Sequence, residues 1–254
     1  MANNDGRLAG KVAIVTGGNG GLGQRIAAQL AAAGANVAVV YGSNRDGARD
    51  VAENLRQIGV KAEPFACNLE EPAQIAKLAG DVEAHFGRID ILINDAAFNK
   101  AIAFQDLDGL DLEIWNKILT TNLTAPMLLI KAVAPAMRRQ GGGRIVNVTS
   151  VAGFQPQGSS IAYAVSKAGL NHLTKCMAVA LAPDILVNGV APGLMEGTRM
   201  TGRLTEEHIK RATATSLLGI AASKEDIAAQ SVLMCQTDTM TGQTVVIDAG
   251  RVFH

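Results

Sequence analysis

The stretch Val12-Ala-Ile-Val-Thr-Gly-Gly-Asn-Gly-Gly-Leu-Gly23 sets the fold expected for this chain. The apolar residues Val12–Val15 predict a buried strand, and an alanine-rich, helix-like segment, Leu22–Ala33, follows the glycines at once. Glycines permit a tight strand-to-helix turn and let a ligand phosphate approach the backbone N–H groups at the positive end of a helix dipole. The turn therefore predicts a dinucleotide-phosphate site, with an ordinary strand-to-helix loop as the alternative.

The same alternation continues along the chain. Further strand-like runs are Val37–Val40, Ile89–Ile93, Arg144–Val148, Leu186–Val190 and Thr244–Ile247, with a weaker one at Lys61–Phe65. Helix-like segments are Arg45–Ile58, Pro72–Phe86, Leu112–Arg139, Ile161–Leu181 and Lys224–Cys235. The strands are apolar throughout, which is typical of a parallel sheet with helices on both faces. The sequence predicts a Rossmann-like, doubly wound α/β fold.

No linker or change in composition divides the 254 residues, so we expect one domain over residues 7–254 after a flexible N-terminal segment, residues 1–6. Residues 193–219 interrupt the alternation with glycines and mixed charges. A long insertion after the carboxyl end of a strand lies over the ligand crevice in open α/β folds. We therefore interpret residues 193–219 as a candidate substrate lid.

Composition excludes several classes of partner. The 23 basic residues balance the 23 acidic ones, without the like-charged blocks of nucleic-acid or anionic-membrane proteins. The most apolar stretch, Leu123–Met137, contains Pro126, Lys131 and Pro135, and the start of the chain does not resemble a signal peptide. We expect a cytoplasmic protein that binds neither nucleic acid nor membrane.

The cysteines and histidines do not predict a metal site. Cys67, Cys176 and Cys235 are widely spaced, so we expect core residues and not a disulfide framework or a metal knuckle. The four histidines, His85, His172, His208 and His254, also lack the spacing of metal ligands.

The end of the second strand-like run bears on the choice of dinucleotide. It lacks the carboxylate that would bind the ribose hydroxyls of NAD and repel a 2′-phosphate. Its hydroxyl, amide and guanidinium groups suit a phosphate instead, which favours NADP while leaving NAD possible. These side chains are Tyr41, Ser43, Asn44 and Arg45. In the alternative reading, residues 43–45 form the cap and first turn of the next helix, and the two readings are compatible. Asp46 is a further candidate ribose ligand in a differently folded loop.

Tyr163 and Lys167 form a candidate catalytic pair. Their i, i+4 spacing places them on one face of a helix. A nearby ammonium favours the phenolate, so we expect Lys167 to lower the pKa of Tyr163. Such a pair arises by chance in some sequences, but Ser150 at the end of an upstream strand makes a mere surface pair a poor explanation.

From about Leu8 to Asp248 the chain resembles the short-chain dehydrogenase/reductase family. The matching segments are Thr16–Gly23, Ile91–Ala97, Trp115 to Asn122, Ser150 with Tyr163 and Lys167, Val187–Gly193 and Thr241–Asp248. The resemblance implies a seven-stranded parallel sheet, a dinucleotide across its carboxyl edge and a homotetramer in which the segments Leu112–Arg139 and Ile161–Leu181 pair between subunits.

The resemblance also implies residue roles. Tyr163 would be the general acid/base and Ser150 would orient and polarise the substrate carbonyl. Lys167 would lower the pKa of Tyr163 and hydrogen-bond the nicotinamide ribose, and Asn122 would hold a water that links Lys167 to solvent. The full set of expected cofactor contacts is Gly17, Asn19, Gly21, Leu22, Gly23, Tyr41, Ser43, Asn44, Arg45, Asn68, Leu69, Asn94, Ala96, Tyr163, Lys167, Pro192, Gly193 and Thr198.

These features predict an NADP-preferring oxidoreductase that transfers a hydride between nicotinamide C4 and a ketone or secondary alcohol. The alternatives are a reductase of 3-oxoacyl thioesters on an acyl-carrier protein and a non-catalytic nucleotide-binding regulator. Residues 194–200, Phe154 and Gln155 are expected to line the substrate pocket.

Three positions depart from the family pattern. The usual Asn-Asn-Ala-Gly segment reads Asn94-Asp-Ala-Ala97, and Gly20 stands where many NADP-preferring relatives have arginine. Asp184 lies near the place of a basic docking residue in carrier-protein reductases, which leaves Arg138, Arg139 and Lys175 as candidate docking cations and argues against an acidic carrier protein.

Overall fold

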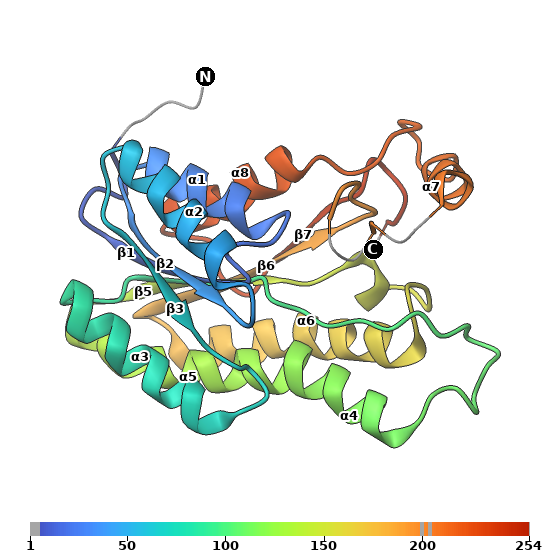
Figure 1. Ribbon diagram of the computed structural model, residues 1–254, viewed down its shortest axis with the longest axis horizontal. Helices are drawn as coiled ribbons and strands as arrows, with labels where there is room; N and C mark the ends of the chain where they lie inside the picture. Colours follow the sequence, from blue (N-terminus) through green and yellow to red (C-terminus); the bar gives the residue numbers. More distant parts are fainter. Residues whose placement is uncertain (1–5, 199–200, 203–204, 254) are drawn as a thin grey trace.

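The computed structural model describes residues 6–198, 201–202 and 205–253. Its centre is a seven-stranded parallel sheet in the order β3-β2-β1-β4-β5-β6-β7 (Figure 1). The strands are β1 (Val12–Thr16), β2 (Asn36–Tyr41), β3 (Ala62–Ala66), β4 (Ile91–Asn94), β5 (Gly143–Val148), β6 (Ile185–Pro192) and β7 (Thr244–Ile247). The predicted doubly wound, seven-stranded fold is confirmed, with most strand ends shifted by one or two residues.

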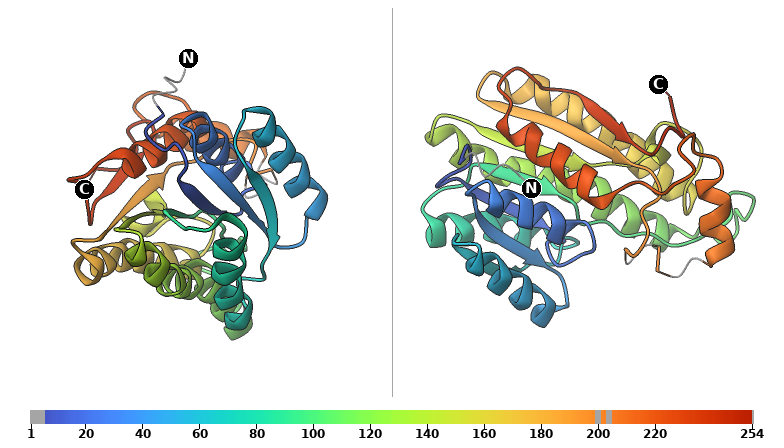
Figure 2. Two further views of the ribbon diagram at one scale, coloured as in Figure 1. Left: turned by 90° about the vertical axis from the view of Figure 1, so that its left-hand side faces the viewer. Right: turned by 90° about the horizontal axis from the view of Figure 1, so that it is seen from above.

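Helices cover both faces of the sheet. On one face lie α1 (Gly23–Ala32), α2 (Arg45–Gln57) and α8 (Lys224–Gln236), and on the other lie α3 (Pro72–Phe86), α5 (Ala125–Arg139) and α6 (Ile161–Leu181). Seen from above, α1 and α8 lie side by side (Figure 2). This two-sided cover explains why the strands are apolar throughout instead of alternating.

The core consists of two layers, one on each face of the sheet. Alternate residues of β1 divide between them: Ala13 and Val15 pack under α1 and α2, whereas Val12 and Ile14 pack toward α3 and α5. Successive side chains of a strand point to opposite faces, so one apolar run supplies both layers. The ends of β1 and β4 are thereby held rigidly at the edge of the sheet where the glycine turn begins.

The expected helix Leu112–Arg139 has an interruption that sequence periodicity did not indicate. It consists of α4 (Leu112–Leu119), a π-helical turn (Thr120–Thr124) and α5. By length and composition this run is apolar enough to cross a membrane, but half of its most apolar window is buried inside the protein, where α5 packs on α3. The π turn contains Asn122, one of the expected catalytic residues.

Three further predictions concern the cysteines, residues 193–219 and the N-terminal segment. Cys67 and Cys235 are buried as predicted, but Cys176 is exposed on α6, so the prediction of a core residue was wrong there. The candidate lid, residues 193–219, contains a helix, α7 (Glu206–Thr213), that was not predicted. Of the segment expected to be flexible, residues 1–6, only Gly6 lies within the described residues.

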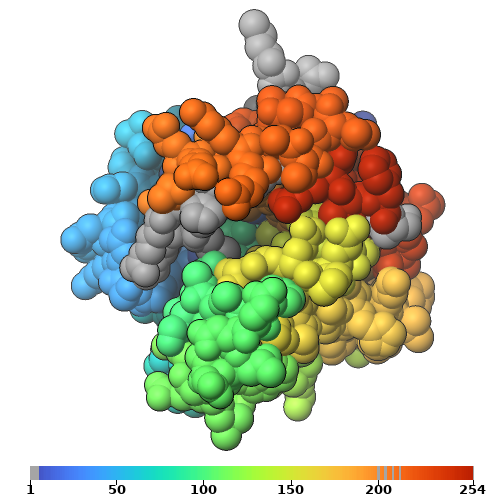
Figure 3. All heavy atoms as spheres, turned by 90° about the vertical axis from the view of Figure 1, so that its right-hand side faces the viewer, coloured from blue at the N-terminus to red at the C-terminus, as the bar shows by residue number. Residues whose placement is uncertain are grey.

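The strand order reverses at β1, because β2 and β4 flank it on opposite sides. In doubly wound sheets the ligand crevice forms outside the carboxyl ends of the strands at such a switch point. Figure 3 looks onto this end of the molecule, where the orange α7 segment, the green residues before α4 and the yellow residues after β5 surround a hollow. The predicted site residues therefore belong around this hollow.

Candidate active site

The glycine turn between β1 and α1 is closely packed against backbone. Gly17 has a φ of +65°, and a Cβ atom there would lie 3.1 Å from Cα of Ala96, beyond the end of β4. At Gly23 a Cβ atom would lie only 2.2 Å from the carbonyl oxygen of Gly17. Both positions therefore require glycine, because any side chain would open the turn.

The N-terminus of α1 fits the phosphates of a dinucleotide. Leu22 occupies the cap position without a capping side chain, and the first turn has no acidic residue. The first N–H groups of a helix need an external acceptor, and the helix dipole favours an anionic one. In this helix the first N–H groups already have acceptors inside the chain, because Gly23 donates to Asp95, and Gln24 and Arg25 donate to backbone carbonyls. The positive end of the helix dipole beside the glycine turn is what favours a pyrophosphate here.

The polar residues at the end of β2 can cap the next helix and still contact a cofactor. Asn44 caps α2, because its side chain accepts the N–H of Gly47 at 3.0 Å. Its carbonyl oxygen accepts Nδ2 of Asn19 at 2.9 Å, which ties this loop to the glycine turn. Tyr41 is partly buried, whereas Ser43 and Arg45 are exposed. The helix-cap reading is confirmed, and it leaves the hydroxyl and guanidinium groups accessible to a ligand.

Ser150, Tyr163 and Lys167 are brought together as predicted. Ser150 ends the segment after β5 and its hydroxyl is hydrogen-bonded to Tyr163. Lys167 is 2% exposed, lies with its Nζ 5.8 Å from the centre of the Tyr163 ring and donates to the carbonyl oxygen of Val148 at 2.8 Å. The three side chains therefore form one site at the carboxyl edge of β5.

Burial dominates the electrostatics of this site. Burial raises the pKa of Tyr163 above its ordinary value, the Ser150 hydrogen bond opposes that rise and the charge of Asp95 adds to it. Burial also lowers the pKa of Lys167 to about 8, against the opposing effect of Asp95. In the protein without cofactor, desolvation of the phenolate outweighs the Ser150 hydrogen bond. The expected lowering of the Tyr163 pKa depends on Lys167 together with the positive charge of a bound nicotinamide, and it stays a prediction.

Asn122 is buried in the π turn and its side chain is fully engaged. Its Oδ1 accepts the N–H of Phe98 at 2.8 Å, and its Nδ2 donates to the Phe98 carbonyl at 2.9 Å and to Oγ of Ser166 at 3.1 Å. The side chain thus joins the loop after β4 to α6 one residue before Lys167. The expected role of Asn122 in holding a water stays a prediction.

Two expected cofactor contacts have their side chains committed elsewhere. Nδ2 of Asn94 donates to Oδ1 of Asn147 on β5 at 2.8 Å, and Asn147 in turn donates to Thr174 on α6. Asn68 beyond β3 accepts the N–H of Glu70 with its Oδ1, and its own N–H is bound by Gln74. These bonds hold the two segments in place, and Ala96 is the residue of its segment that meets the glycine turn.

Two residues at this edge were missed as site residues. The hydroxyl of Thr16 donates to the carbonyl of Ile93 and accepts the N–H groups of both Asp95 and Ala96 at 3.1 Å. Asp95 in turn accepts the N–H of Gly23, at the first residue of α1. The sequence signal for Asp95 was an acidic residue directly after the buried strand β4. Burying a carboxylate without a partner costs free energy, so such a residue is expected to have a specific role.

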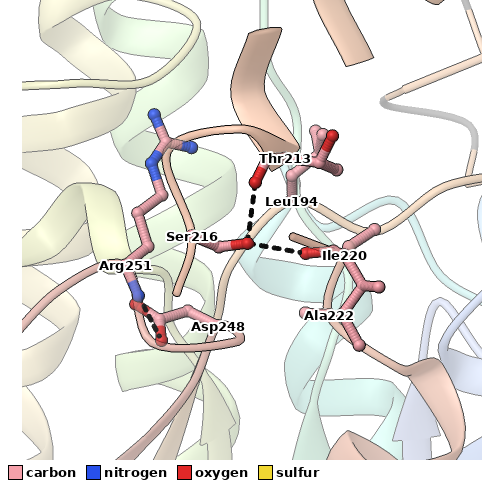
Figure 4. A pocket seen from close by; sticks show the side chains of 8 residues that line it. Leu194, Thr213, Ser216, Ile220, Ala222, Asp248 and Arg251 are labelled. Atoms are coloured by element: carbon pink, nitrogen blue, oxygen red, sulfur yellow. Dashed lines mark hydrogen bonds between the residues drawn. The ribbon is translucent and has the colours of Figure 1, made fainter. Parts of the chain in front are cut away.

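The candidate lid is joined to both the cofactor region and the C-terminal segment. Gly21 packs closely on Thr198, because a Cβ atom at Gly21 would lie 3.1 Å from Cα of Thr198. Gly193, after β6, donates its N–H to the carbonyl oxygen of Ile247. Ser216 binds the carbonyls of Thr213 and Ile220 beside Asp248, as Figure 4 shows. Pro192, Gly193 and Thr198 therefore lie where the lid leaves the sheet.

A doubly wound sheet with a glycine turn at the start of α1 and a Ser-Tyr-Lys site at its carboxyl edge defines a Rossmann-type oxidoreductase. Comparison with known proteins agrees. Residues 11–209 match the family model described as short chain dehydrogenase. The chain belongs to this family, whose members use a nicotinamide cofactor, and it is an oxidoreductase acting on carbonyl or hydroxyl groups.

Relatives align over nearly the whole chain. The 3-oxoacyl-(acyl-carrier-protein) reductase FabG of Aquifex aeolicus (strain VF5) is 36% identical over 96% of this chain and 98% of its own. Dehydrogenase/reductase SDR family member 4 of Homo sapiens is 36% identical over 96% of this chain and 88% of its own. Among solved structures, the Pseudomonas aeruginosa RhlG/NADP active-site complex has a TM-score of 0.88 at 31% identity and covers 96% of this chain and 97% of its own.

Proposed function

We propose that the protein is an NADP-preferring reductase of small or medium ketones, or dehydrogenase of the corresponding secondary alcohols, in which Tyr163 transfers the proton. The observation that carries this proposal is the hydrogen-bonded Ser150–Tyr163 pair with the buried Lys167 beside it. The nicotinamide dinucleotide, when bound, supplies or accepts the hydride. The glycine turn and the positive dipole end of α1 would hold its phosphates.

Each of the three side chains has a distinct task. In the reductive direction negative charge develops on the substrate oxygen, where the Ser150 hydroxyl stabilises it and the Tyr163 phenol delivers a proton. The raised pKa of Tyr163 keeps the phenol protonated at neutral pH, as proton donation requires. Lys167, with its ammonium near the Tyr163 ring, favours the phenolate left after the transfer.

Several observations support NADP as the preferred cofactor. The exposed Ser43 and Arg45 beyond β2 offer a hydroxyl and a guanidinium for a 2′-phosphate, and Arg45 stands at the first residue of α2, where the helix dipole adds to the attraction. The Pseudomonas aeruginosa relative RhlG, which shares the whole fold, forms an active-site complex with NADP. NAD remains the alternative cofactor.

The names of two relatives favour a second substrate class, 3-oxoacyl thioesters. They are FabG of Aquifex aeolicus and the granaticin polyketide synthase putative ketoacyl reductase 2 of Streptomyces violaceoruber, 35% identical over 94% of this chain and 95% of its own. Two of the three candidate docking cations are engaged with carboxylates, however: Arg138 pairs with Asp184, and Arg139 pairs with Glu83. These pairs weaken the field that would attract an acidic carrier protein, which supports a free small molecule as substrate.

We also propose a homotetramer that pairs the α4–α5 and α6 helices of neighbouring subunits. Large apolar side chains on these helices support it, since Leu112 is 72% exposed and Val179 is 83% exposed. Single exposed apolar residues are common on protein surfaces, so these two side chains are compatible with the pairing, and the resemblance to the family carries the proposal. The cytoplasm stays the predicted compartment.

The test is an NADPH and NADH oxidation screen over cyclic, aliphatic, sugar and 3-oxoacyl ketones, run in parallel with Tyr163→Phe. We expect turnover of at least one ketone class by the unmodified enzyme and a loss of kcat of at least about 100-fold in the variant, since general acid catalysis is worth that much. Dinucleotide affinity, measured by fluorescence titration, should stay within about threefold because the phenylalanine keeps the ring. Turnover retained by Tyr163→Phe would contradict the mechanism. Cofactor binding without turnover of any ketone would favour the regulator.

A further inference from the structure

The end of the chain folds around the side chain of Asp248, which directly follows β7 and is 8% exposed. Its Oδ1 accepts the N–H groups of Gly250 at 2.9 Å and Arg251 at 3.1 Å, and its Oδ2 accepts the N–H of Val252 at 2.7 Å. Figure 4 marks the bond from Arg251. Ala249 has a φ of +60°, in the left-handed region that is unfavourable for a residue with a Cβ atom. The carboxylate of Asp248 therefore holds residues 249–252, here called the C-terminal turn, in a conformation that Ala249 would not prefer by itself.

The C-terminal turn contacts the last part of the candidate lid through its backbone. The carbonyl oxygen of Gly250 accepts the N–H of Leu217 at 3.2 Å. The carbonyl oxygen of Ala249 accepts the N–H of Leu218 at 3.1 Å. The side chains of Leu217 and Leu218 are 78% and 68% exposed, so their burial contributes little to holding the lid here. The position of Leu217 and Leu218 therefore depends on the C-terminal turn.

Asp248 also contacts the start of the lid. A Cβ atom at Gly193 would lie 2.7 Å from Cβ of Asp248, and the N–H of Gly193 is held by the carbonyl oxygen of Ile247 at 2.9 Å. The two ends of the lid are joined to each other, because the N–H of Ala222 donates to the carbonyl oxygen of Leu194 at 2.8 Å. Both ends of the lid thus meet at Asp248 and the turn that it shapes.

We propose that Asp248 is a positioning residue for substrate binding, which acts by holding the C-terminal turn against the lid. This inference rests on the proposed function, in which the lid forms one wall of the substrate pocket. At its other side the lid packs on the glycine turn, where Thr198 meets Gly21. The Ser-Tyr-Lys site lies outside the lid, on the segment after β5 and on α6. A displaced lid base should therefore weaken substrate binding more than it slows the chemical step.

Asp248→Ala tests the proposal, because alanine removes all three acceptor contacts but keeps the Cβ atom that meets Gly193. The substrate is the ketone with the highest kcat/KM in the oxidation screen. We expect its KM to rise by about tenfold, while kcat and the Kd for the dinucleotide change by less than about threefold, as for a loss of uniform binding. Steady-state kinetics and fluorescence titration give these constants. A fall in kcat with KM unchanged would overturn the proposal.

Hydrogen exchange separates this inference from the proposed function, since it requires no turnover. In Asp248→Ala the backbone amides of Leu217 and Leu218 should lose at least about tenfold of their protection, because their acceptors are no longer held in place. Mass spectrometry of peptides that cover residues 214–222 measures this loss. If no ketone is turned over, the proposed function fails, and the exchange result still decides whether Asp248 holds the lid. Unchanged protection would overturn the proposal, and so would faster exchange with an unchanged KM.

The matched control is Ser223→Ala. Ser223 lies just beyond the lid and caps α8 by accepting the N–H of Asp226 at 3.1 Å. Its loss removes a side-chain acceptor of the same kind without touching the C-terminal turn, so KM and the exchange of Leu217 and Leu218 should stay unchanged. Equal effects in Ser223→Ala and Asp248→Ala would contradict a specific role of Asp248.

A milder variant, Asp248→Asn, covers the case in which Asp248→Ala does not fold. Asparagine keeps an acceptor oxygen for the N–H groups of Gly250 and Arg251 but turns an amide donor toward the N–H of Val252. We expect the same changes at smaller size, with KM raised by about threefold, because part of the contact is kept. An Asp248→Asn enzyme with the KM and the exchange of the unmodified protein would refute the proposal.

Discussion

At the scale of single residues, burial and neighbouring groups determine which side chains of the site are charged. Lys167 is almost completely buried, yet its Nζ has the Val148 carbonyl as a partner and the charge of Asp95 nearby. Desolvation disfavours every buried charge, and each charged form survives only as far as its neighbours compensate. The charge states of Tyr163 and Lys167 therefore depend on burial and on neighbours outside the pair.

Arg45 provides the residue-scale test of cofactor choice. Arg45→Ala removes the guanidinium proposed to face the 2′-phosphate of NADP but leaves Asn44 as the cap of α2. We expect the Kd for NADPH to rise by about tenfold, the cost of one charge-assisted contact, while the Kd for NADH changes by less than about twofold. Fluorescence titration of both cofactors measures the two constants. Equal effects on NADPH and NADH would refute the assignment of Arg45.

At the scale of elements, the start of α6 places the catalytic tyrosine. Ser160 is fully buried and caps the helix by accepting the N–H of Tyr163 itself, at 3.2 Å. The same helix then presents Lys167 one turn later and Ser166 to Asn122 in the π turn. One capping bond thus fixes the register of the side chains that carry the chemistry.

Ser160→Ala should therefore affect catalysis as well as stability. Loss of an N-cap bond costs about 1 kcal/mol of the free energy of unfolding. We expect kcat to fall by about tenfold with little change in KM, since a small displacement of the reacting group is enough to slow the chemical step. Urea unfolding and steady-state kinetics give the two quantities.

The matched control for that variant is Asp111→Ala, which removes the same kind of bond from the N-terminus of α4, where Asp111 accepts the N–H of Ile114. It should lose similar stability without losing kcat. If both variants lost kcat equally, the effect would belong to stability alone and Ser160 would have no special role.

At the scale of the whole molecule, the two edges of the sheet have different electrostatic roles. The carboxyl edge holds the active site, whereas the amino edge is fastened by Asp90. Its carboxylate accepts the N–H of Val12 and pairs with Arg88 at 2.6 Å and Lys11 at 3.2 Å. These hydrogen bonds and charges outweigh burial and lower the pKa of Asp90 in the folded protein.

The lowered pKa of Asp90 predicts a specific pH dependence of unfolding. An acid whose pKa is lower in the folded state stabilises above its unfolded pKa, about 3.9, and loses that contribution as pH falls through the folded value. Asp90→Asn should cost about 2 kcal/mol at pH 7 because its partners lose a charged acceptor, while Arg88 and Lys11 remain partly solvated. Chemical unfolding at several pH values should show this difference shrinking below about pH 4. A difference that is constant with pH would contradict the assignment.

The proposed homotetramer is tested at the same scale. Light scattering at micromolar concentration should give four times the 26.4 kDa of one chain. Val179→Glu, which places a charge on the exposed apolar face of α6, should shift the mass downward because burying an unpaired charge opposes association. A monomer in the unmodified protein would contradict this arrangement.

The sequence by itself determined the parts that depend on local chemistry. Strands that are apolar throughout predicted a parallel sheet with helices on both faces. The glycines of residues 17–23 predicted the strand-to-helix turn, and the spacing of Tyr163 and Lys167 placed both side chains on the same face of a helix. Each of these features follows from the periodicity of a strand or a helix, or from the absence of a Cβ, so neighbouring residues are enough to establish it.

Only the tertiary structure decided the features that join distant segments. Asp95 lies 72 residues from Gly23 in the chain, and only the adjacent pairing of β4 with β1 brings its carboxylate to α1. The raised pKa of Tyr163 in the protein without cofactor has the same kind of cause. Desolvation depends on everything packed around a group, whereas the i, i+4 spacing reports one neighbour. The residues of the site follow from the sequence, but their electrostatic balance is a property of the folded molecule.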